Sequence, residues 1–301
     1  MSPPAKILLL ILIITVLLVV SSVLSVVLAI PIFGIGMNEI LRILSNPDDS
    51  GIGVVKFFQI SESLFIFLAP ALLGAWLFSD NTVKYLQASK KPGGFTLLLV
   101  MLTLGVCIPM MNALALFNSG MDLPGWMDPV ESRIKAMEES AGRLTELFLA
   151  GRNAQDLTVN LLMIAVLPAL GEEFLFRGVL QRLFTDWTRN RHVGIWITAF
   201  VFSFIHFQFF GFLPRFLLGI YFGYLLVWSG SIWVPIVAHF INNTIAVVYY
   251  HFTAQPMGET PMDTLGTGAD SHPALYVSVF LTAILIGITF LRERENRLSY
   301  R

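Results

Sequence analysis

The chain has 301 residues, of which 55% are hydrophobic and only 13% are charged. Soluble domains carry about 25% charged residues, so this composition excludes an ordinary soluble protein and predicts a polytopic membrane protein. The formal net charge of −1 gives no electrostatic basis for a nucleic-acid partner. A single cysteine, Cys107, excludes an intramolecular disulfide and a cysteine-based zinc site.

Several segments of the chain are apolar and long enough to span a bilayer, for which about 20 residues are needed. They cover residues 7–30, 57–78, 95–117, 157–181, 193–210, 213–229, 231–250 and 273–291. The first run is much longer than the apolar region of a signal peptide, so we interpret it as a retained transmembrane helix. We therefore expect an all-α polytopic bundle of about eight transmembrane helices.

The hydrophilic segment 118–156 interleaves charged residues with Leu144, Leu147 and Phe148. This spacing predicts an amphipathic helix at the membrane surface. With a cytoplasmic N-terminus, the inner segments contain Lys6, Lys84, Lys90, Lys91, Arg182, Arg189, Arg191, Arg292, Arg294, Arg297 and Arg301. The positive-inside rule therefore predicts that both termini are cytoplasmic.

Three charged residues, Glu172, Glu173 and Arg177, lie within the apolar stretch 161–180. A charge at the bilayer centre costs roughly 2.5–3.5 kcal/mol on insertion scales, so such residues face a partner or a cavity. Glu173 and Arg177 are i,i+4 neighbours on a helix, and we expect them to form an ion pair. Glu172 lies about 100° away around the helix and is left to face a cavity.

Two histidines, His206 and His239, occur in strongly apolar surroundings further along the chain. His239 and Asn243 are i,i+4 and share a helix face, so their donors can converge on one oxygen. A carboxylate, an imidazole and polar donors are the groups needed for attack of water on a carbonyl. Gly219 and Gly223 form a small-xxx-small surface that predicts close helix packing.

Together these elements resemble the ordered motifs of the CPBP intramembrane proteases. The motifs are Glu172-Glu173-x-x-x-Arg177, Phe202-x-x-x-His206, Phe216-x-x-Gly219-x-x-x-Gly223 and His239-x-x-x-Asn243. That family includes the type II CAAX prenyl endopeptidases and bacteriocin-related immunity and processing proteins. The resemblance divides the chain into N-terminal transmembrane helices with the interfacial segment (1–154), a catalytic core (155–250), and an outer loop, last helix and basic tail (251–301).

The resemblance implies that the chain is a membrane endopeptidase in which Glu172 and His206 activate the attacking water. It assigns stabilisation of the oxyanion to His239 and Asn243, a supporting role to Glu173 and Arg177, and helix packing to Phe202, Phe216, Gly219 and Gly223. The substrate would be a lipidated or membrane-anchored protein or peptide. Because Glu172 lies late in a span that runs from outside to inside, we expect the site in the cytoplasmic half of the membrane.

Metal dependence is open at this point. Glu172, His206 and His239 are candidate ligands for a zinc ion with one open position, and the family is often labelled metalloprotease. A glutamate-water mechanism needs no ion, and we favour that alternative.

Other functions compete with proteolysis. In a non-catalytic scaffold the polar cluster would only pack helices, and a bacteriocin-immunity factor is a related alternative. A proton-coupled transporter would use the Glu/His cluster as a relay, although the absence of repeated halves disfavours it. The compact chain with short loops favours the plasma membrane of a prokaryote.

Overall fold

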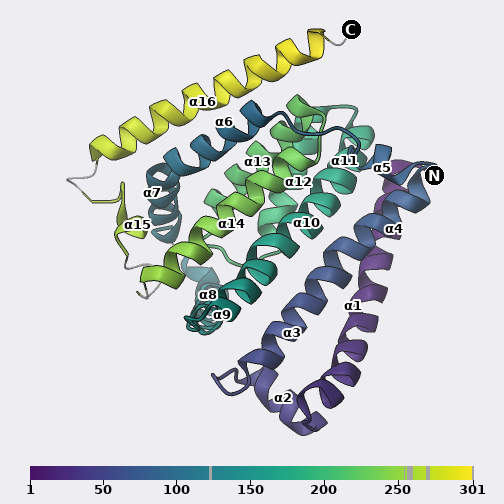
Figure 1. The fold of residues 1–301 in the computed structure, drawn as a ribbon, viewed down its shortest axis with the longest axis vertical. Coiled ribbons are helices and arrows are strands. Elements are labelled where there is room, and N and C mark those ends of the chain that lie inside the picture. Colours follow the sequence, from purple (N-terminus) through teal and green to yellow (C-terminus); the bar gives the residue numbers. More distant parts are fainter. Residues whose placement is uncertain (122–123, 254, 256–259, 269–271, 300–301) are drawn as a thin grey trace.

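The computed structural model describes residues 1–121, 124–253, 255, 260–268 and 272–299, with side chains through Asn296. These described residues form helices joined by turns, without a strand (Figure 1). The expected all-α bundle is therefore confirmed. Arg301 and part of the loop 251–271 lie outside the described residues, so the expectations for them stay untested.

The N-terminal part is a pair of long helices joined by a short one. Its elements are α1 (Pro3–Phe33), α2 (Met37–Ser45), α3 (Ile52–Glu62), η1 (Ser63–Leu68) and α4 (Ala69–Phe78). The stretch from α3 to α4 is one helix whose middle turn, η1, is a π-helix. Ser25 and Ser61 join α1 to α3 through hydroxyls 2.6 Å apart. The amphipathic helix α2, which buries Ile40 and Ile43, was not predicted.

The next part contains a bent helix pair and the amphipathic helix. Its elements are α5 (Thr82–Tyr85), α6 (Gly94–Val106), α7 (Ile108–Ser119), η2 (Gly125–Met127) and α8 (Asp128–Leu149). The predicted span 95–117 is broken, because α6 and α7 meet at a bend of 47°. Pro109 lies in the first turn of α7, where a backbone N–H has no partner within the helix, so its absence costs no hydrogen bond. The predicted amphipathic helix of segment 118–156 is present as α8.

A single long helix, Ala154–Thr188, contains the Glu-Glu pair. It consists of α9 (Ala154–Asn160), η3 (Leu161–Val166), α10 (Leu167–Glu173), η4 (Phe174–Leu180) and α11 (Gln181–Thr188). The short stretch α10 is thus flanked by two π-helices, η3 and η4. In proteins π-helices are rare and are frequently found at functional sites. The remaining elements are α12 (Arg191–Phe204), α13 (Phe212–Ser229), α14 (Trp233–Thr253), α15 (Pro261–Thr264) and α16 (His272–Ser299).

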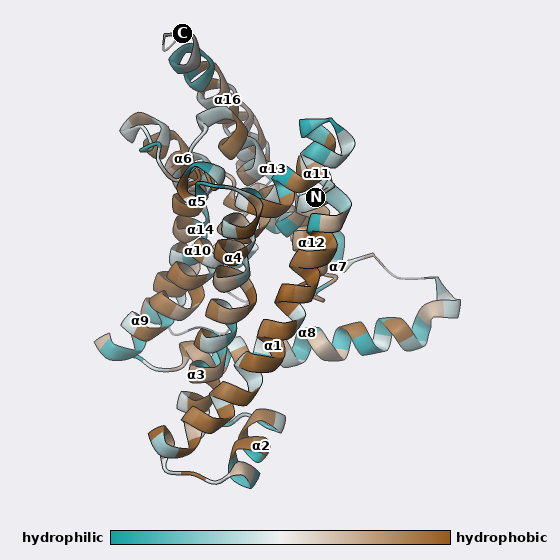
Figure 2. Ribbon diagram, turned by 90° about the vertical axis from the view of Figure 1, so that its right-hand side faces the viewer, coloured by the Kyte–Doolittle hydropathy of each residue, from teal (hydrophilic) through white to brown (hydrophobic). Residues whose placement is uncertain are grey.

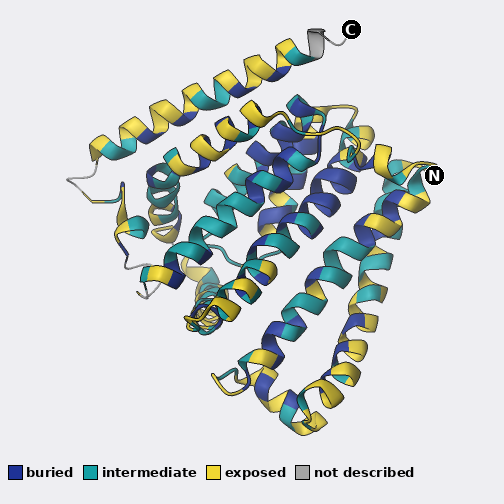
Figure 3. Cartoon of the chain, viewed as in Figure 1, coloured by how far each residue is buried: buried dark blue, intermediate teal, exposed yellow. Residues whose placement is uncertain are grey.

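The structure gives the chain the character of an integral membrane protein but does not confirm a count of eight spans. Among the described residues, five helices are long and apolar enough to cross a membrane, or six if the bent pair is one span. One shortfall is α12, which has only 14 residues because it ends at Phe204 rather than at the predicted residue 210. Exposed apolar side chains cover much of α1 and α16, where lipid would meet them (Figure 3).

The bundle has two ends, which differ in the segments they gather. One end, here called the basic end, comprises residues 1–6, 79–93, 181–191, 229–232 and 293–299. Its segments are joined by hydrogen bonds from Lys90 Nζ to the Ser229 carbonyl oxygen (2.6 Å) and from Arg182 Nη1 to the Tyr85 carbonyl oxygen (3.2 Å). A hydrogen bond from Thr96 to Glu293 brings the end of α16 there as well.

The opposite end, here called the α8 end, comprises residues 34–51, 124–153, 205–211 and 249–253. Arg152 Nη1 joins it to the end of α14 by a hydrogen bond of 2.9 Å to the His251 carbonyl oxygen. Figure 2 shows α2, α8 and α9 at this end, away from the N-terminus and α11.

Candidate active site

The ion pair between Glu173 and Arg177 is fully buried. Arg177 Nη1 donates to Glu173 Oε1 at 2.8 Å, and both side chains are 0% exposed. Arg177 Nη2 donates to the carbonyl oxygen of Gly219 on α13 at 3.1 Å. The guanidinium also lies 4.5 Å from the centroid of the Phe202 ring, which is cation–π distance. These contacts tie η4 to α12 and α13.

His239 lies between the two glutamates. Its Nδ1 donates to Glu173 Oε1 at 2.9 Å, and its Nε2 stands 3.9 Å from Glu172 Oε2. Because Nδ1 is engaged by Glu173, only Nε2 is available to a ligand. Nε2 then acts as an acceptor in the neutral ring and as a donor when the ring is protonated.

His206 lies just beyond the end of α12, not inside a helix as the predicted span 193–210 implied. Its Nδ1 is 2.7 Å from the carbonyl oxygen of Phe202, one of the carbonyls left free at a helix C-terminus. A carbonyl only accepts, so Nδ1 carries the hydrogen and Nε2 of the neutral ring is an acceptor. The chain turns sharply at Phe207, whose φ is 52°.

Asn243 contacts the π-helix η3 as well as the site. Its Nδ2 donates to the carbonyl oxygen of Ile164 at 2.8 Å, and its Oδ1 accepts from Asn242 Nδ2 at 3.1 Å. One amide hydrogen of Asn243 therefore remains for a ligand. We expected His239 and Asn243 to donate hydrogen bonds to one oxygen. Each side chain already has one donor engaged, namely Nδ1 of His239 and one amide hydrogen of Asn243, so only the remaining groups are available for this role.

These side chains line one cavity of about 630 Å³. Among the described residues, no side chain or backbone group is hydrogen-bonded to the Glu172 carboxylate. The structure thus brings together five of the sequence-predicted residues, Glu172, Phe202, His206, His239 and Asn243. The ring of Phe222 lines the cavity beside them. Part of the opposite wall is formed by α8 through Ala141, Leu144, Thr145 and Phe148.

Two charged residues near this cavity were missed by the sequence analysis. Arg215 lines the cavity, its Nη2 donates to Gln208 Oε1 at 2.6 Å, and its Nη1 is buried without a partner. A signal was present, because Arg215 is the only Asp, Glu, Lys or Arg between Arg191 and Glu259. An isolated charge in a membrane segment indicates a functional site.

The second is Glu138 on α8, which accepts a hydrogen bond of 2.9 Å from the Phe210 N–H. Burial raises the pKa of the Glu138 carboxyl above its usual value, while the neighbouring N–H groups and the Arg215 charge act in the opposite direction. Glu138 thereby holds α8 against the turn that contains His206. It lies far from the motifs in sequence, and nothing in its own segment distinguishes it from the other acidic residues there.

The zinc-site alternative does not fit this geometry. Among the described residues, no group of three or more His, Cys, Asp or Glu is arranged to hold a metal ion. His206 and His239 each keep Nε2 free, as a metal-ligating histidine does, but among the described residues Glu172 pairs with His239 alone, at 3.9 Å. The candidate set Glu172, His206 and His239 therefore does not form a metal centre in this arrangement.

The glycine pair lies where α13 approaches its neighbours closely. A Cβ added at Gly223 would lie 2.8 Å from Gln181 Oε1 and 2.8 Å from Ile195 Cγ2, and one at Gly219 would lie 3.1 Å from the Cβ of Ala199. Phe216, by contrast, packs against the Trp196 ring at a centroid distance of 5.8 Å, outside the site.

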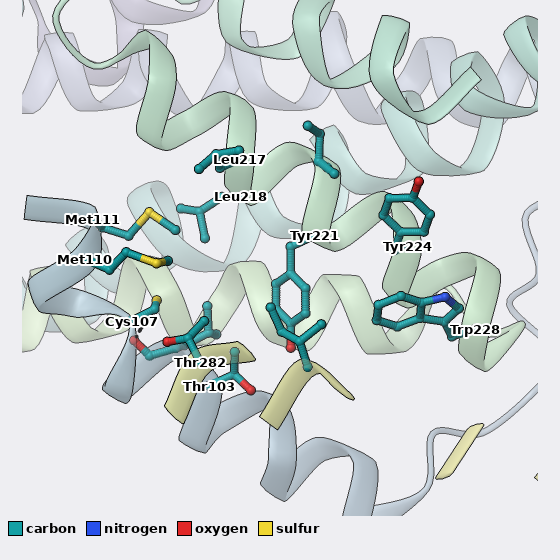
Figure 4. A pocket seen from close by; sticks show the side chains of 13 residues that line it. Thr103, Cys107, Met110, Met111, Leu217, Leu218, Tyr221, Tyr224, Trp228 and Thr282 are labelled. Atoms are coloured by element: carbon teal, nitrogen blue, oxygen red, sulfur yellow. Dashed lines mark hydrogen bonds between the residues drawn. The ribbon is translucent and has the colours of Figure 1, made fainter. Parts of the chain in front are cut away.

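A second cavity, of about 350 Å³, lies between α6, α7, α13 and α16 and contains none of the predicted site residues (Figure 4). Apolar side chains dominate its lining, together with the Thr103, Tyr221, Tyr224 and Thr282 hydroxyl groups. Cys107 is 5% exposed there and its thiol bonds the Leu104 carbonyl oxygen at 3.3 Å. This is the environment of a small core residue, not of a nucleophile.

Comparison with known proteins points to one family. Residues 154–245 match the family described as type II CAAX prenyl endopeptidase Rce1-like. The uncharacterized protein YpbD of Bacillus subtilis (strain 168) is 31% identical over 100 residues, which cover 31% of this chain and 47% of that protein. An uncharacterized 24.3 kDa protein of Escherichia coli is 30% identical over 112 residues, or 35% of this chain and 50% of that protein.

The chain thus spans about half the length of the curated relatives it matches. No solved structure matches it. The matched segment contains all four motifs and every side chain that they contribute to the cavity. Residues 154–245 of this integral membrane protein therefore resemble the type II CAAX prenyl endopeptidase Rce1-like family.

Proposed function

We propose that this protein is an intramembrane endopeptidase in which Glu172 and His206 activate a water molecule for attack on a peptide carbonyl. The observation that carries the proposal is the pairing of chemistries in one cavity. Glu172 is a carboxylate without a hydrogen-bond partner among the described residues, and His206 is an imidazole whose tautomer is fixed by the Phe202 carbonyl. Both groups face the same space.

In the proposed reaction Glu172 takes one proton from the attacking water, and Nε2 of His206 accepts a hydrogen bond from the other hydrogen of that water, which stays on its oxygen, and so orients it. General acid–base catalysis of this kind contributes about 10²–10⁴-fold to a rate. The proton held by Glu172 then passes to the leaving amine as the tetrahedral intermediate collapses. Peptide and water are the only reactants in this sequence.

The oxyanion would be met by the remaining amide hydrogen of Asn243 and by Nε2 of His239 in its protonated form. Donors fixed in advance at such a position are often the largest single contribution to catalysis. Glu173 orients His239 through the Nδ1 hydrogen bond of 2.9 Å. Arg177 holds Glu173 in turn, so these two residues are positioning groups in this proposal.

The proposed substrate is a lipidated or membrane-anchored protein or peptide, because the cavity lies within a bundle that contacts lipid. The test uses the purified protein in liposomes with a lipidated CAAX reporter and a peptide library from a membrane proteome. We expect cleavage by the wild-type protein, none by Glu172→Ala, and no effect of EDTA. Cleavage of nothing by a folded wild-type protein would favour the scaffold or transporter alternatives, and normal cleavage by Glu172→Ala would reject the assigned base.

A further inference from the structure

One charged side chain in the active-site cavity lacks a partner of opposite charge. Arg215 lies in the first turn of α13 and lines the cavity together with Glu172 and His206. Its Nη2 donates to the neutral side chain of Gln208, and its Nη1 is buried without a hydrogen-bond partner. Among the described residues, no carboxylate oxygen lies within 4.0 Å of this guanidinium, the limit for an ion pair.

The acidic residue that faces Arg215 from α8 does not pair with it. Glu138 is close enough for the two charges to act on each other. One of its carboxylate oxygens accepts from the Phe210 N–H at 2.9 Å, and the other is buried without a partner. A buried charge without a partner is unfavourable, and in a membrane protein such a residue indicates a functional site. The guanidinium of Arg215 is therefore available to an anionic ligand.

The turn between α12 and α13 holds this guanidinium in place. Gln208 Oε1 accepts from Arg215 Nη2 at 2.6 Å. A Cβ added at Gly211 would lie 3.1 Å from the same nitrogen, so the backbone of the turn packs against the guanidinium. The turn is itself held, since Ser203 Oγ donates to the Phe212 carbonyl oxygen at 2.7 Å. An arginine that is positioned in advance loses less side-chain entropy when it binds an anion.

The position of Arg215 on α13 gives its distance from the catalytic groups. Glu172 stands near the middle of the helix Ala154–Thr188, not late in it, and the cavity extends from there to the α12–α13 turn and α8. Arg215 and Phe222 line the cavity from one face of α13, and the Phe222 ring packs against His239 at a centroid distance of 5.7 Å. Phe222 lies seven residues after Arg215, which is about 10 Å along an α-helix. An extended peptide advances about 3.3–3.6 Å per residue, so about three residues fit between the peptide bond at His239 and Arg215.

We infer that Arg215 binds the C-terminal carboxylate of the substrate and so determines which peptide bond is cleaved. The inference rests on the proposed protease function. The planar guanidinium pairs with a carboxylate through two parallel hydrogen bonds, and a peptide offers that group at its C-terminus and on acidic side chains. The hydrogen bond between Glu138 and Phe210 joins α8 to the turn beside Arg215. A peptide that ends at Arg215 therefore fits more simply than one that continues between the two joined elements.

The role of Arg215 can be measured by binding, without any cleavage. The Glu172→Ala protein in detergent is titrated with three fluorescent forms of the lipidated CAAX reporter peptide, which has no acidic residue near its C-terminus. The first form has a free C-terminal carboxylate, the second a C-terminal amide, and the third a free carboxylate after four additional residues. Each titration is repeated with Arg215→Gln, Arg215→Lys or Arg143→Gln added, and the unfolding temperature of every variant is measured.

We expect the free carboxylate form to bind at least about tenfold more tightly than the amide, because a charged hydrogen bond is lost in the amide. The extended form should bind like the amide. Arg215→Gln should abolish the preference, Arg215→Lys should retain part of it, and Arg143→Gln should leave it unchanged. Equal binding of the carboxylate and the amide, an undiminished preference in a folded Arg215→Gln protein, tight binding of the extended form, or no binding of any form would overturn the inference.

A second measurement separates this inference from the proposed function. The protein with an intact Glu172 is reconstituted in liposomes, and kcat/KM is compared for the carboxylate and amide forms. A preference of at least about tenfold for the carboxylate form, lost in Arg215→Gln, supports the inference. Equal cleavage of both forms would leave the protease function standing and overturn the role of Arg215. If binding follows the inference but neither form is cleaved, the proposed function fails while Arg215 remains a carboxylate-binding residue.

Discussion

Glu172 and Glu173 are neighbours in sequence and differ in what surrounds them. The Glu173 carboxylate accepts hydrogen bonds from Arg177 and His239, whereas the Glu172 carboxylate faces the cavity. Adjacent helix positions point about 100° apart, which is why one pair of identical residues serves two purposes. The first glutamate is available for chemistry and the second fixes the groups around it.

Removal of Glu173 should therefore reduce stability. Glu173→Ala leaves Arg177 and His239 without their carboxylate in a buried site, and breaking a buried ion pair in this way costs about 3–5 kcal/mol. We expect a clearly lower unfolding temperature in detergent. The control is Glu139→Ala, since Glu139 is 72% exposed and stands 3.9 Å from Arg143. Equal unfolding temperatures for the two variants would show that the Glu173 pair is not structural.

Arg215 should contribute to catalysis or substrate binding. Its guanidinium is the charged donor group closest in sequence to His206 and lines the same cavity. Arg215→Gln removes a charged hydrogen-bond donor, so we expect kcat/KM for the reporter to fall at least about tenfold. Arg143→Gln, on an exposed part of α8, should leave kcat/KM unchanged. Similar values for both variants would show that Arg215 does not act on the substrate.

At the scale of elements, helical spacing explains what the sequence could predict. The pairs Glu173/Arg177 and His239/Asn243 follow from i,i+4 geometry, and the shared cavity wall follows from the order of the spans. His206 was misplaced because residues 193–210 are mostly apolar, and no proline or glycine lies between Gly194 and Gly211 to mark the end of α12. The π-helices and the contribution of Glu138 depend on tertiary packing, which no local pattern encodes.

A side chain at Gly223 should disrupt the close packing of α13 against its neighbouring helices. Gly223→Ala places a methyl group 2.8 Å from Gln181 Oε1 and from Ile195. Overpacking of this kind costs typically about 1–3 kcal/mol, so the unfolding temperature should fall. Gly105→Ala is the control, because nothing lies within 4 Å of a Cβ added at Gly105. If Gly223→Ala unfolds no earlier than Gly105→Ala, the close packing does not contribute to stability.

The attachment of α8 should depend on pH through Glu138, which lies outside the membrane-spanning helices. Its raised pKa means that the docked state favours the protonated carboxyl. The resulting stabilisation is present at low pH and is lost as the pH rises from the usual glutamate pKa through the raised value. Glu138→Gln keeps an acceptor for the Phe210 N–H and removes the titration.

Hydrogen exchange of the Phe210 amide checks this expectation for α8. In the wild-type protein its protection, corrected for intrinsic exchange, should fall as the pH rises, and in Glu138→Gln it should stay constant. The same pH dependence in both proteins would mean that another group controls the attachment of α8.

At the scale of the whole molecule, composition was enough to predict a helical membrane protein, and the motifs were enough to predict which family residues 154–245 match. The helix count was less predictable, because a bend of 47° at Cys107 divides one span and α12 falls short of another. The end of the bundle toward which the cavity extends could not be predicted from the sequence. It depends on where the long helix ends and on which side of the bundle α8 packs.

The central claim is that Glu172 and His206 act on the same water molecule. A double-mutant cycle with Glu172→Gln, His206→Gln and the double variant, using reporter cleavage in liposomes, tests it most directly. Each single variant should lose about 10²–10⁴-fold in kcat without a change in unfolding temperature. Residues that act as a unit are strongly non-additive, so the double variant should be about as slow as the slower single variant. Multiplied losses in the double variant, or a single variant that retains wild-type cleavage, would contradict the claim.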